Sequence, residues 1–188
     1  TANPSLIHAI AASLTLGVAV SIVSTIFGVL AAKAVTRYYM PGRGIVMSVI
    51  MVPLVIPFII LAIALLTIFR KFLDIELSLW TIGAAHVLIC VPFSMLVMMS
   101  RLQGFDKSLE EASAALGQGP WTTFWKVTFP LAVPGIVSSL LLCFTTSFDE
   151  YLLAAFLAGN DATLPLFIFS QLRFPTRLPG TLALGSCI

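Results

Sequence analysis

Long uncharged stretches dominate this sequence and constrain its fold more than any other feature. Of 188 residues, 59% are hydrophobic and only 10% are charged, whereas ordinary soluble domains carry roughly 25% charged residues. Too few polar side chains remain to cover a globule in water. The composition therefore argues against a soluble enzyme and a disordered tail, and a formal net charge of +2 is too small to indicate nucleic-acid binding. We predict a chain that lies in a lipid bilayer.

The apolar runs are long enough to cross a membrane several times. A spanning helix needs roughly 20 mostly apolar residues, so the chain has room for four or five spans and little else. We predict an all-α, polytopic helix bundle that forms one transmembrane domain over residues 1–188. Because the sequence begins at Thr1 without an initiator Met and ends in an apolar stretch, we expect a fragment of a longer protein. The predicted spans are 5–32, 44–69, 77–100 and 131–157, with the start of another at 181–188.

The polar intervals between these runs alternate between the two faces of the membrane. Intervals 33–43 and 101–130 fall on one face, and intervals 70–76 and 159–180 fall on the other. The first face carries six Lys and Arg residues and the second carries four. The positive-inside rule therefore places the interval 101–130 in the cytoplasm.

The interval 101–130 predicts a helix, a turn and a second helix. Ser108 and Glu111 have the spacing of a capping box, in which each side chain accepts a hydrogen bond from the backbone N–H of the other residue. Gly117 fits the position after a helix end, where φ is positive. Pro120 fits the first position of a helix.

An aromatic face follows in the second of these helices. Trp121, Phe124 and Trp125 fall at i, i+3 and i+4, so their rings share one side, which we expect to be buried. From these residues alone, an ordinary amphipathic connector between two spans is the alternative interpretation.

A spaced motif occupies the same loop. Glu111-Ala112-Ser113 is followed after three residues by Gly117, and after nine more by Val127-Thr128-Phe129-Pro130. This stretch resembles the EAA loop of binding-protein-dependent ABC importer permeases, whose pattern is EAA, three residues, Gly, nine residues and Ile-x-Leu-Pro. Ser113, Val127 and Phe129 depart from that pattern but are close in size to the usual residues.

The resemblance implies a function for the loop and a set of partners. In the family this loop is a cytoplasmic coupling helix that docks into a groove on the ATP-binding subunit. The implied assembly, in a bacterial inner membrane, adds a second permease subunit, two ATP-binding subunits and an extracytoplasmic substrate-binding protein. This chain would be a noncatalytic permease of spans two to five that binds no cofactor, with ATP and Mg held by partner subunits. The implied docking residues are Glu110, Glu111, Ala112, Ser113, Leu116, Gly117, Gln118, Pro120 and Trp121.

An acidic pair interrupts the fourth apolar run. Ser147-Phe148-Asp149-Glu150, with the run 164–170, resembles the second permease of spermidine/putrescine transporters and their opine-type relatives, which implies a polyamine substrate. Carboxylates attract a cationic amine and aromatic faces add cation–π contact, so the candidate substrate path is Phe148, Asp149, Glu150 and Tyr151. An interfacial acidic pair that simply ends a helix is the alternative.

His86 is the one titratable group inside its run, and we expect it to hydrogen-bond across a helix interface. The sequence offers no Walker-type loop, no metal-ligand spacing and no plausible Ser-His-Asp set. Two other function classes stay open on the residues alone. One is an ion-coupled carrier or channel that uses Asp149, Glu150 and His86. The other is a scaffold whose loop recruits a cytosolic partner.

Overall fold

The computed structural model describes residues 4–39, 41–106 and 108–173, and these residues form helices and connecting loops without a strand. The predicted all-α, polytopic helix bundle is confirmed. The predicted span start at 181–188 lies outside the described residues. In chain order the helices are α1 (Pro4–Arg37), α2 (Arg43–Val55), α3 (Phe58–Thr67), the π-helix η1 (Ile68–Phe72), α4 (Leu79–Gln103), α5 (Ser108–Ala115), α6 (Pro120–Thr123), the π-helix η2 (Phe124–Thr128), α7 (Phe129–Asp149), α8 (Leu152–Leu157) and α9 (Leu164–Gln171).

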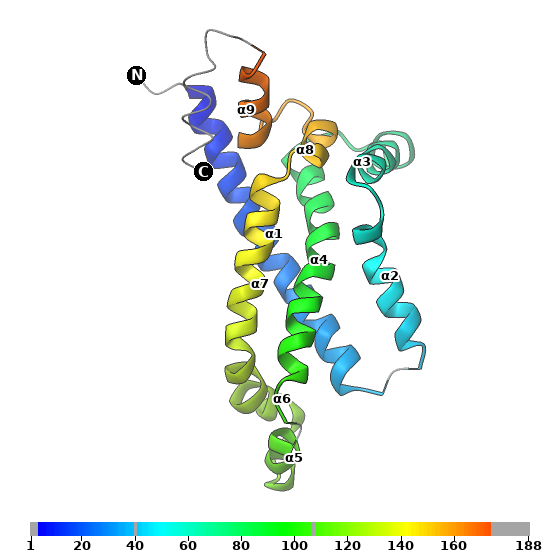
Figure 1. The fold of residues 1–188 in the computed structure, drawn as a ribbon, viewed down its shortest axis with the longest axis vertical. Helices are drawn as coiled ribbons and strands as arrows, with labels where there is room; N and C mark the ends of the chain where they lie inside the picture. Colours follow the sequence, from blue (N-terminus) through cyan, green and yellow to red (C-terminus); the bar gives the residue numbers. More distant parts are fainter. Residues whose placement is uncertain (1–3, 40, 107, 174–188) are drawn as a thin grey trace.

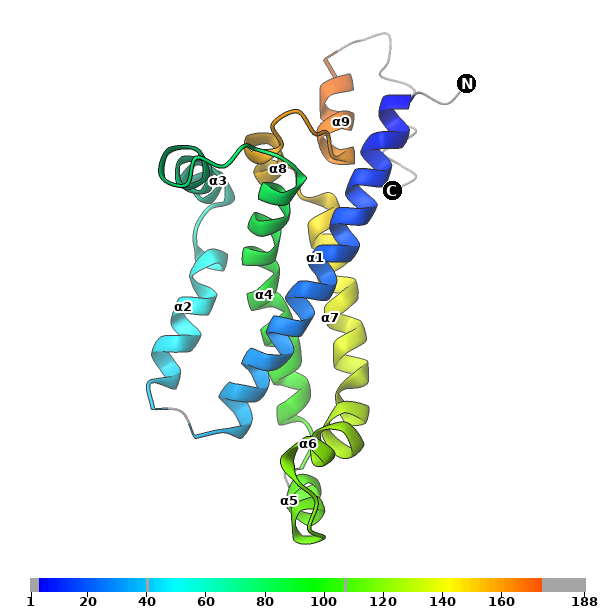
Figure 2. The same ribbon diagram turned by 180° about the vertical axis from the view of Figure 1, so that it is seen from behind.

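Three long helices, α1, α4 and α7, form the body of the molecule and lie side by side (Figures 1 and 2). Helices α1 and α4 are each long and apolar enough to cross a membrane. Helix α7 meets the same criterion when it is taken together with α6 and η2, which continue into it, as the stretch Pro120–Asp149. Small residues allow the helices to approach closely. A side chain added at Gly28 of α1 would collide with Ser94 of α4.

Buried hydroxyl groups also connect the three long helices. The Thr25 and Ser139 hydroxyls of α1 and α7 are 3.2 Å apart, and Ser139 donates to Ser94 of α4 at 2.6 Å. Interhelical hydrogen bonds of this kind supply specific contacts where the lipid tails are as apolar as the helix surfaces. The three helices are thus joined by close packing and by a short polar ladder.

The predicted span 44–69 is divided in the structure. Helices α2 and α3 meet at an angle of 102°, with the break at residues 56–57. A proline disfavours the helical conformation of the residue before it, and Ile56 is accordingly extended, with φ −77° and ψ 129°. Pro53 lies inside α2 and Pro92 inside α4, and neither of them ends its helix. Among Pro53, Pro57 and Pro92, it is therefore Pro57 that coincides with the sharp break.

The predicted span 131–157 is also divided. Helix α7 ends at Asp149, and the short helix α8 begins at Leu152. This break places α8 beside α3 and α4 at one end of the bundle, where α9 also lies (Figure 1). The link between α1 and α2 and the loop that carries α5 and α6 lie at the opposite end, as the alternation of the polar intervals predicts.

Candidate functional site

The loop between α4 and α7 projects from one end of the bundle (Figure 1). Gly117 has φ +80°, so the predicted left-handed glycine after the first loop helix is confirmed. Its amide donates to the Ala114 carbonyl at 2.9 Å, and the Gln118 amide donates to the Ser113 carbonyl at 3.2 Å. This pair of bonds satisfies carbonyls at the end of α5 and reverses the chain. Pro120 then begins α6, as predicted.

The start of α5 differs from the prediction. Ser108 is already helical, and its backbone N–H donates to Asp106 Oδ1 at 3.0 Å. No hydrogen bond joins Ser108 to Glu111 among the described residues, so the predicted capping box does not form. Asp is as good an N-terminal cap as Ser, and Asp106 takes the role. Hydrogen bonds from the backbone and side chain of Ser108 lower the pKa of Asp106 below its usual value.

Most of the predicted docking residues lie on the exposed surface of this loop. Leu116 is 82% exposed and Trp121 is 73% exposed, so the loop presents an apolar tip. Two predicted docking residues face the protein instead. Ser113 is bonded to the Thr123 hydroxyl at 2.9 Å, and Glu110 turns toward α1. The remaining docking residues, all exposed, are Glu111, Ala112, Gly117, Gln118 and Pro120.

The predicted aromatic face is present but is not buried within this chain. The rings of Trp121 and Trp125 are 5.8 Å apart, and those of Trp125 and Phe129 are 4.9 Å apart. Trp125 is about half exposed. Trp125 and Phe129 stand where a spanning helix begins and suit the membrane–water interface, where tryptophan is enriched. Trp121, the most exposed of the three, belongs to the apolar tip.

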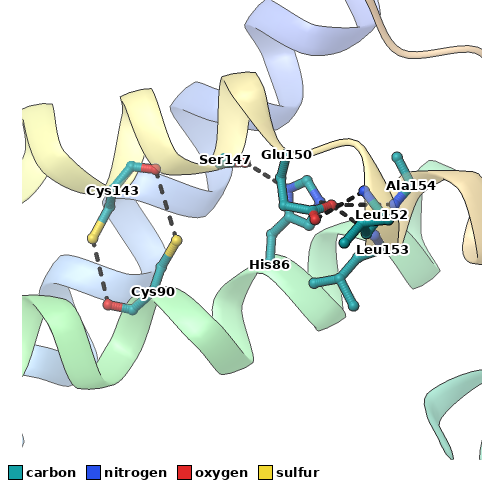
Figure 3. Close-up of polar contacts among 8 residues, drawn as sticks. All are labelled: His86, Cys90, Cys143, Ser147, Glu150, Leu152, Leu153 and Ala154. Atoms are coloured by element: carbon teal, nitrogen blue, oxygen red, sulfur yellow. Dashed lines mark hydrogen bonds and ion pairs between the residues drawn. The ribbon is translucent and has the colours of Figure 1, made fainter. Parts of the chain in front are cut away.

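The acidic pair lies at the opposite end of the bundle, where α7 ends. Glu150 is only 8% exposed, and its carboxylate accepts three backbone N–H groups of α8 (Figure 3). The donors are Leu152 at 3.0 Å, Leu153 at 2.8 Å and Ala154 at 3.3 Å. A carboxylate at this position satisfies free amides and complements the helix dipole. Tyr151 occupies the N-cap position of α8, and the Glu150 side chain, one residue earlier, caps the helix by accepting its first amides.

His86 of α4 joins this cap to α7. Its Nδ1 lies 2.8 Å from the Ser147 hydroxyl, which confirms the predicted hydrogen bond across a helix interface (Figure 3). Its Nε2 lies 3.4 Å from Glu150 Oε2. Both side chains are buried, so one polar cluster holds α4, α7 and α8 together.

Asp149 is not part of this buried cluster; it is exposed and lines an open groove of about 430 Å³. Phe148, Tyr151 and Phe169 contribute aromatic rings to the same groove, and the Tyr151 and Phe169 rings are 4.6 Å apart. Aliphatic side chains of Leu164, Ile168 and Leu172, with Pro165, complete the lining. A carboxylate among aromatic rings suits an organic cation.

Sequence reasoning missed several residues that the structure brings to these sites. Phe169 joins the groove because α9 folds back beside Tyr151. Arg37 and Thr128 contact Glu110 at the other end of the bundle. The polar block that ends α1 contains Arg37, but no local pattern connects that block to a glutamate in a distant loop.

Comparison with known proteins gives one family and several relatives. Residues 24–187 match the family described as the binding-protein-dependent transport system inner membrane component. The spermidine/putrescine transport system permease protein PotC of Escherichia coli (strain K12) is 36% identical over 172 residues, which cover 91% of this chain and 65% of the relative. The putrescine transport system permease protein PotI of the same strain is 33% identical over 178 residues, covering 91% of this chain and 63% of the relative.

A solved structure shares the fold. The crystal structure of a bacterial ABC transporter involved in the import of the acidic polysaccharide alginate matches with a TM-score of 0.55 and 20% sequence identity. The match covers 92% of this chain and 64% of that chain. This chain spans slightly less than two thirds of the length of the PotC and PotI relatives.

Proposed function

Because this chain belongs to the family of binding-protein-dependent transport system inner membrane components, we propose that it is the transmembrane permease subunit of an ATP-driven ABC importer. It is a multi-pass protein of the inner membrane. In this proposal it forms half of a translocation path and carries no catalytic site. The observation that carries the proposal is the family match over residues 24–187.

The proposed assembly has a second permease subunit, two ATP-binding subunits and an extracytoplasmic substrate-binding protein. The exposed tip at Leu116 and Trp121 supports docking. Covering these large apolar side chains with a partner removes apolar surface from water, and the favourable free energy grows with the area buried. ATP and Mg would be bound by the ATP-binding subunits, and this chain would bind no cofactor. Closure of the ATP-binding pair would draw the coupling loops together and shift the permease pair toward its outward-open state.

The proposed substrate is a polyamine such as spermidine or putrescine, or a related small organic cation. The names of the PotC and PotI relatives support this class. The groove that contains Phe148, Asp149 and Tyr151 supports it independently, since it combines a carboxylate with aromatic rings. Within the acidic pair, Asp149 is the residue available to a cation, whereas Glu150 caps α8.

Reconstitution of the whole transporter tests the proposal. The full-length protein is co-purified with its neighbouring gene products, placed in vesicles, and supplied with the binding protein and labelled spermidine or putrescine. We expect co-purification of ATP-binding chains and uptake that requires ATP. Uptake that follows an ion gradient and ignores ATP would instead establish an ion-coupled carrier. Titration of the binding protein with polyamines, opines, amino acids and sugars would identify the substrate class.

A further inference from the structure

We propose that a largely buried ion pair between Arg37 and Glu110 transmits the movement of the coupling loop to α1. The inference rests on the proposed importer function and assigns a positioning role to two residues. Arg37 is the last residue of α1, and Glu110 lies in the first turns of α5. The pair thus connects the projecting loop directly to a spanning helix.

The Glu110 carboxylate joins three elements. Its Oε2 lies 3.3 Å from Arg37 Nε, and the two side chains are only 20% and 7% exposed. Its Oε1 accepts a hydrogen bond from the Thr128 hydroxyl at 2.6 Å, and the Thr128 residue is buried in η2. One carboxylate of α5 therefore contacts both α1, through an ion pair, and η2, through a hydrogen bond.

The Arg37 guanidinium makes two further contacts at the end of α4. Its Nη2 donates to the Leu102 carbonyl at 2.9 Å, and its central carbon lies 4.7 Å from the centre of the Phe105 ring. A guanidinium can serve several partners at once because it is planar and has five N–H donors. Arg37 thus ties the loop helix to two spanning helices.

A second cation on the same face of α1 supports this contact. Lys33 lies one turn before Arg37, and residues four apart on a helix are neighbours. The Lys33 ammonium lies 4.1 Å from the centre of the Phe124 ring in η2. Lys33 and Arg37 therefore contact adjacent parts of the loop, and among the described residues it is Arg37 that forms an ion pair with α5.

The packing of α5 explains why this pair matters for coupling. None of the described residues of α5 is fully buried, and the helix packs otherwise on α6 and η2. Separating a largely buried ion pair is costly because each charge loses its partner without regaining full hydration. A displacement of α5 is therefore passed to α1, which packs along α4 and α7.

The test uses Arg37→Gln in the complete reconstituted transporter. We expect ATP-dependent uptake to fall by roughly 5- to 150-fold, the usual range of coupling between two sites. We expect co-purification of the ATP-binding subunits and their ATP hydrolysis to continue. The matched control is Arg43→Gln, which removes an exposed cation at the same end of the bundle and is expected to leave uptake unchanged.

A double-mutant cycle isolates the pair. Arg37→Glu and Glu110→Arg are each expected to uncouple uptake from hydrolysis, and the charge-swapped double variant is expected to recover part of the uptake. Glu111→Gln provides the contrast, since Glu111 is exposed and belongs to the proposed docking surface. Its expected effect is weaker co-purification of the ATP-binding subunits.

The outcomes separate the inference from the proposed function. Wild-type uptake by Arg37→Gln would overturn the inference alone, as would joint loss of uptake and of the ATP-binding subunits in a correctly inserted protein. Absence of ATP-dependent uptake in the wild-type complex would overturn the proposed function and this inference with it. If Arg37→Gln fails to insert, Thr128→Val decides: reduced uptake with retained hydrolysis supports the role of the Glu110 carboxylate, and unchanged uptake excludes it.

Discussion

Asp149 and Glu150 are adjacent carboxylates with different environments. Helix α7 ends at Asp149, so the chain turns between the two residues and Glu150 reaches back to the amides of α8. Asp149 stays exposed on the groove. Glu150 therefore organises a helix end, and Asp149 is the residue of the pair that lines the groove and stays a candidate for the proposed substrate path.

Asp149→Asn is expected to reduce uptake of a cationic substrate without affecting folding. The substitution keeps the shape of the side chain and removes its charge, so the groove loses its electrostatic attraction. We expect uptake at limiting substrate to fall by about tenfold, equivalent to about 1.4 kcal/mol. The measurement is initial uptake rate against substrate concentration. An unchanged rate would show that Asp149 does not contact the path.

Glu150→Ala is expected to reduce stability, because α8 loses its cap and His86 loses a neighbour. Removal of a helix cap costs about 0.5–2 kcal/mol. Thermal unfolding of the purified protein in detergent should show a lower midpoint for Glu150→Ala than for the wild type. Asp149→Asn is the control and should keep the wild-type midpoint. Equal midpoints for Glu150→Ala and the wild type would contradict the capping role.

At the scale of elements, breaks in the helices decide where functional groups lie. The left-handed Gly117 ends α5 and turns the chain into α6, so the apolar tip projects from the bundle. The break after α7 orients α8, and the break at Pro57 lets α3 pack on α8. The breaks at Gly117 and Pro57 follow from backbone chemistry, but the consequence of every break depends on the helices around it.

Gly117→Asp is expected to abolish transport while the protein still inserts in the membrane. A Cβ at this glycine would meet no atom of this chain within 4 Å, so the cost within the chain is the strain of a positive φ, about 1–2 kcal/mol. The larger loss would come from the docking partner. The measurements are membrane yield, co-purification of the ATP-binding subunits and uptake. Wild-type uptake with normal co-purification would place the docking contact elsewhere.

At the scale of the whole molecule, the two proposed sites lie at opposite ends of the bundle. The loop with α5 and α6 projects from one end, and α9 lies at the other (Figure 2). Residues of α9 line the groove. The ladder of Ser94 and Ser139 lies along the helices between the two ends, and the buried cluster of His86 and Glu150 lies at the end that carries the groove. A transporter needs such a separation, because energy input and substrate entry occur on different sides of the membrane.

Labelling of single cysteines tests this arrangement. Leu116→Cys, in the exposed tip, is expected to react with a membrane-impermeant reagent only from the cytoplasmic side. Asn160→Cys, in an exposed turn at the other end, is expected to react only from outside. Two of the three wild-type cysteines, Cys90 and Cys143, are buried. Cys187 lies outside the described residues, so the protein without an added cysteine gives the background for all three. Labelling of both positions from the same side would contradict the topology.

Much of the fold follows from local pattern. Hydropathy marks the spanning segments because a lipid-exposed backbone must satisfy its polar groups internally, and Gly117 and Pro120 mark the loop because their backbone preferences are intrinsic. The cap of α5 was predicted at the wrong residue, since Asp106 and Ser108 are equally suitable and lie close together. The division of 44–69 into two helices was not predicted, because proline within a membrane helix is often tolerated.

Local patterns along the chain are thus enough to identify a helical membrane protein with a motif-bearing loop between two spans. Those properties depend on residues close together along the chain. Only the tertiary structure decided that Glu110 pairs with Arg37, that Glu150 rather than Asp149 is buried, and that Phe169 completes the groove. Each of these depends on how helices distant in sequence pack, and packing is set jointly by all the surfaces in contact.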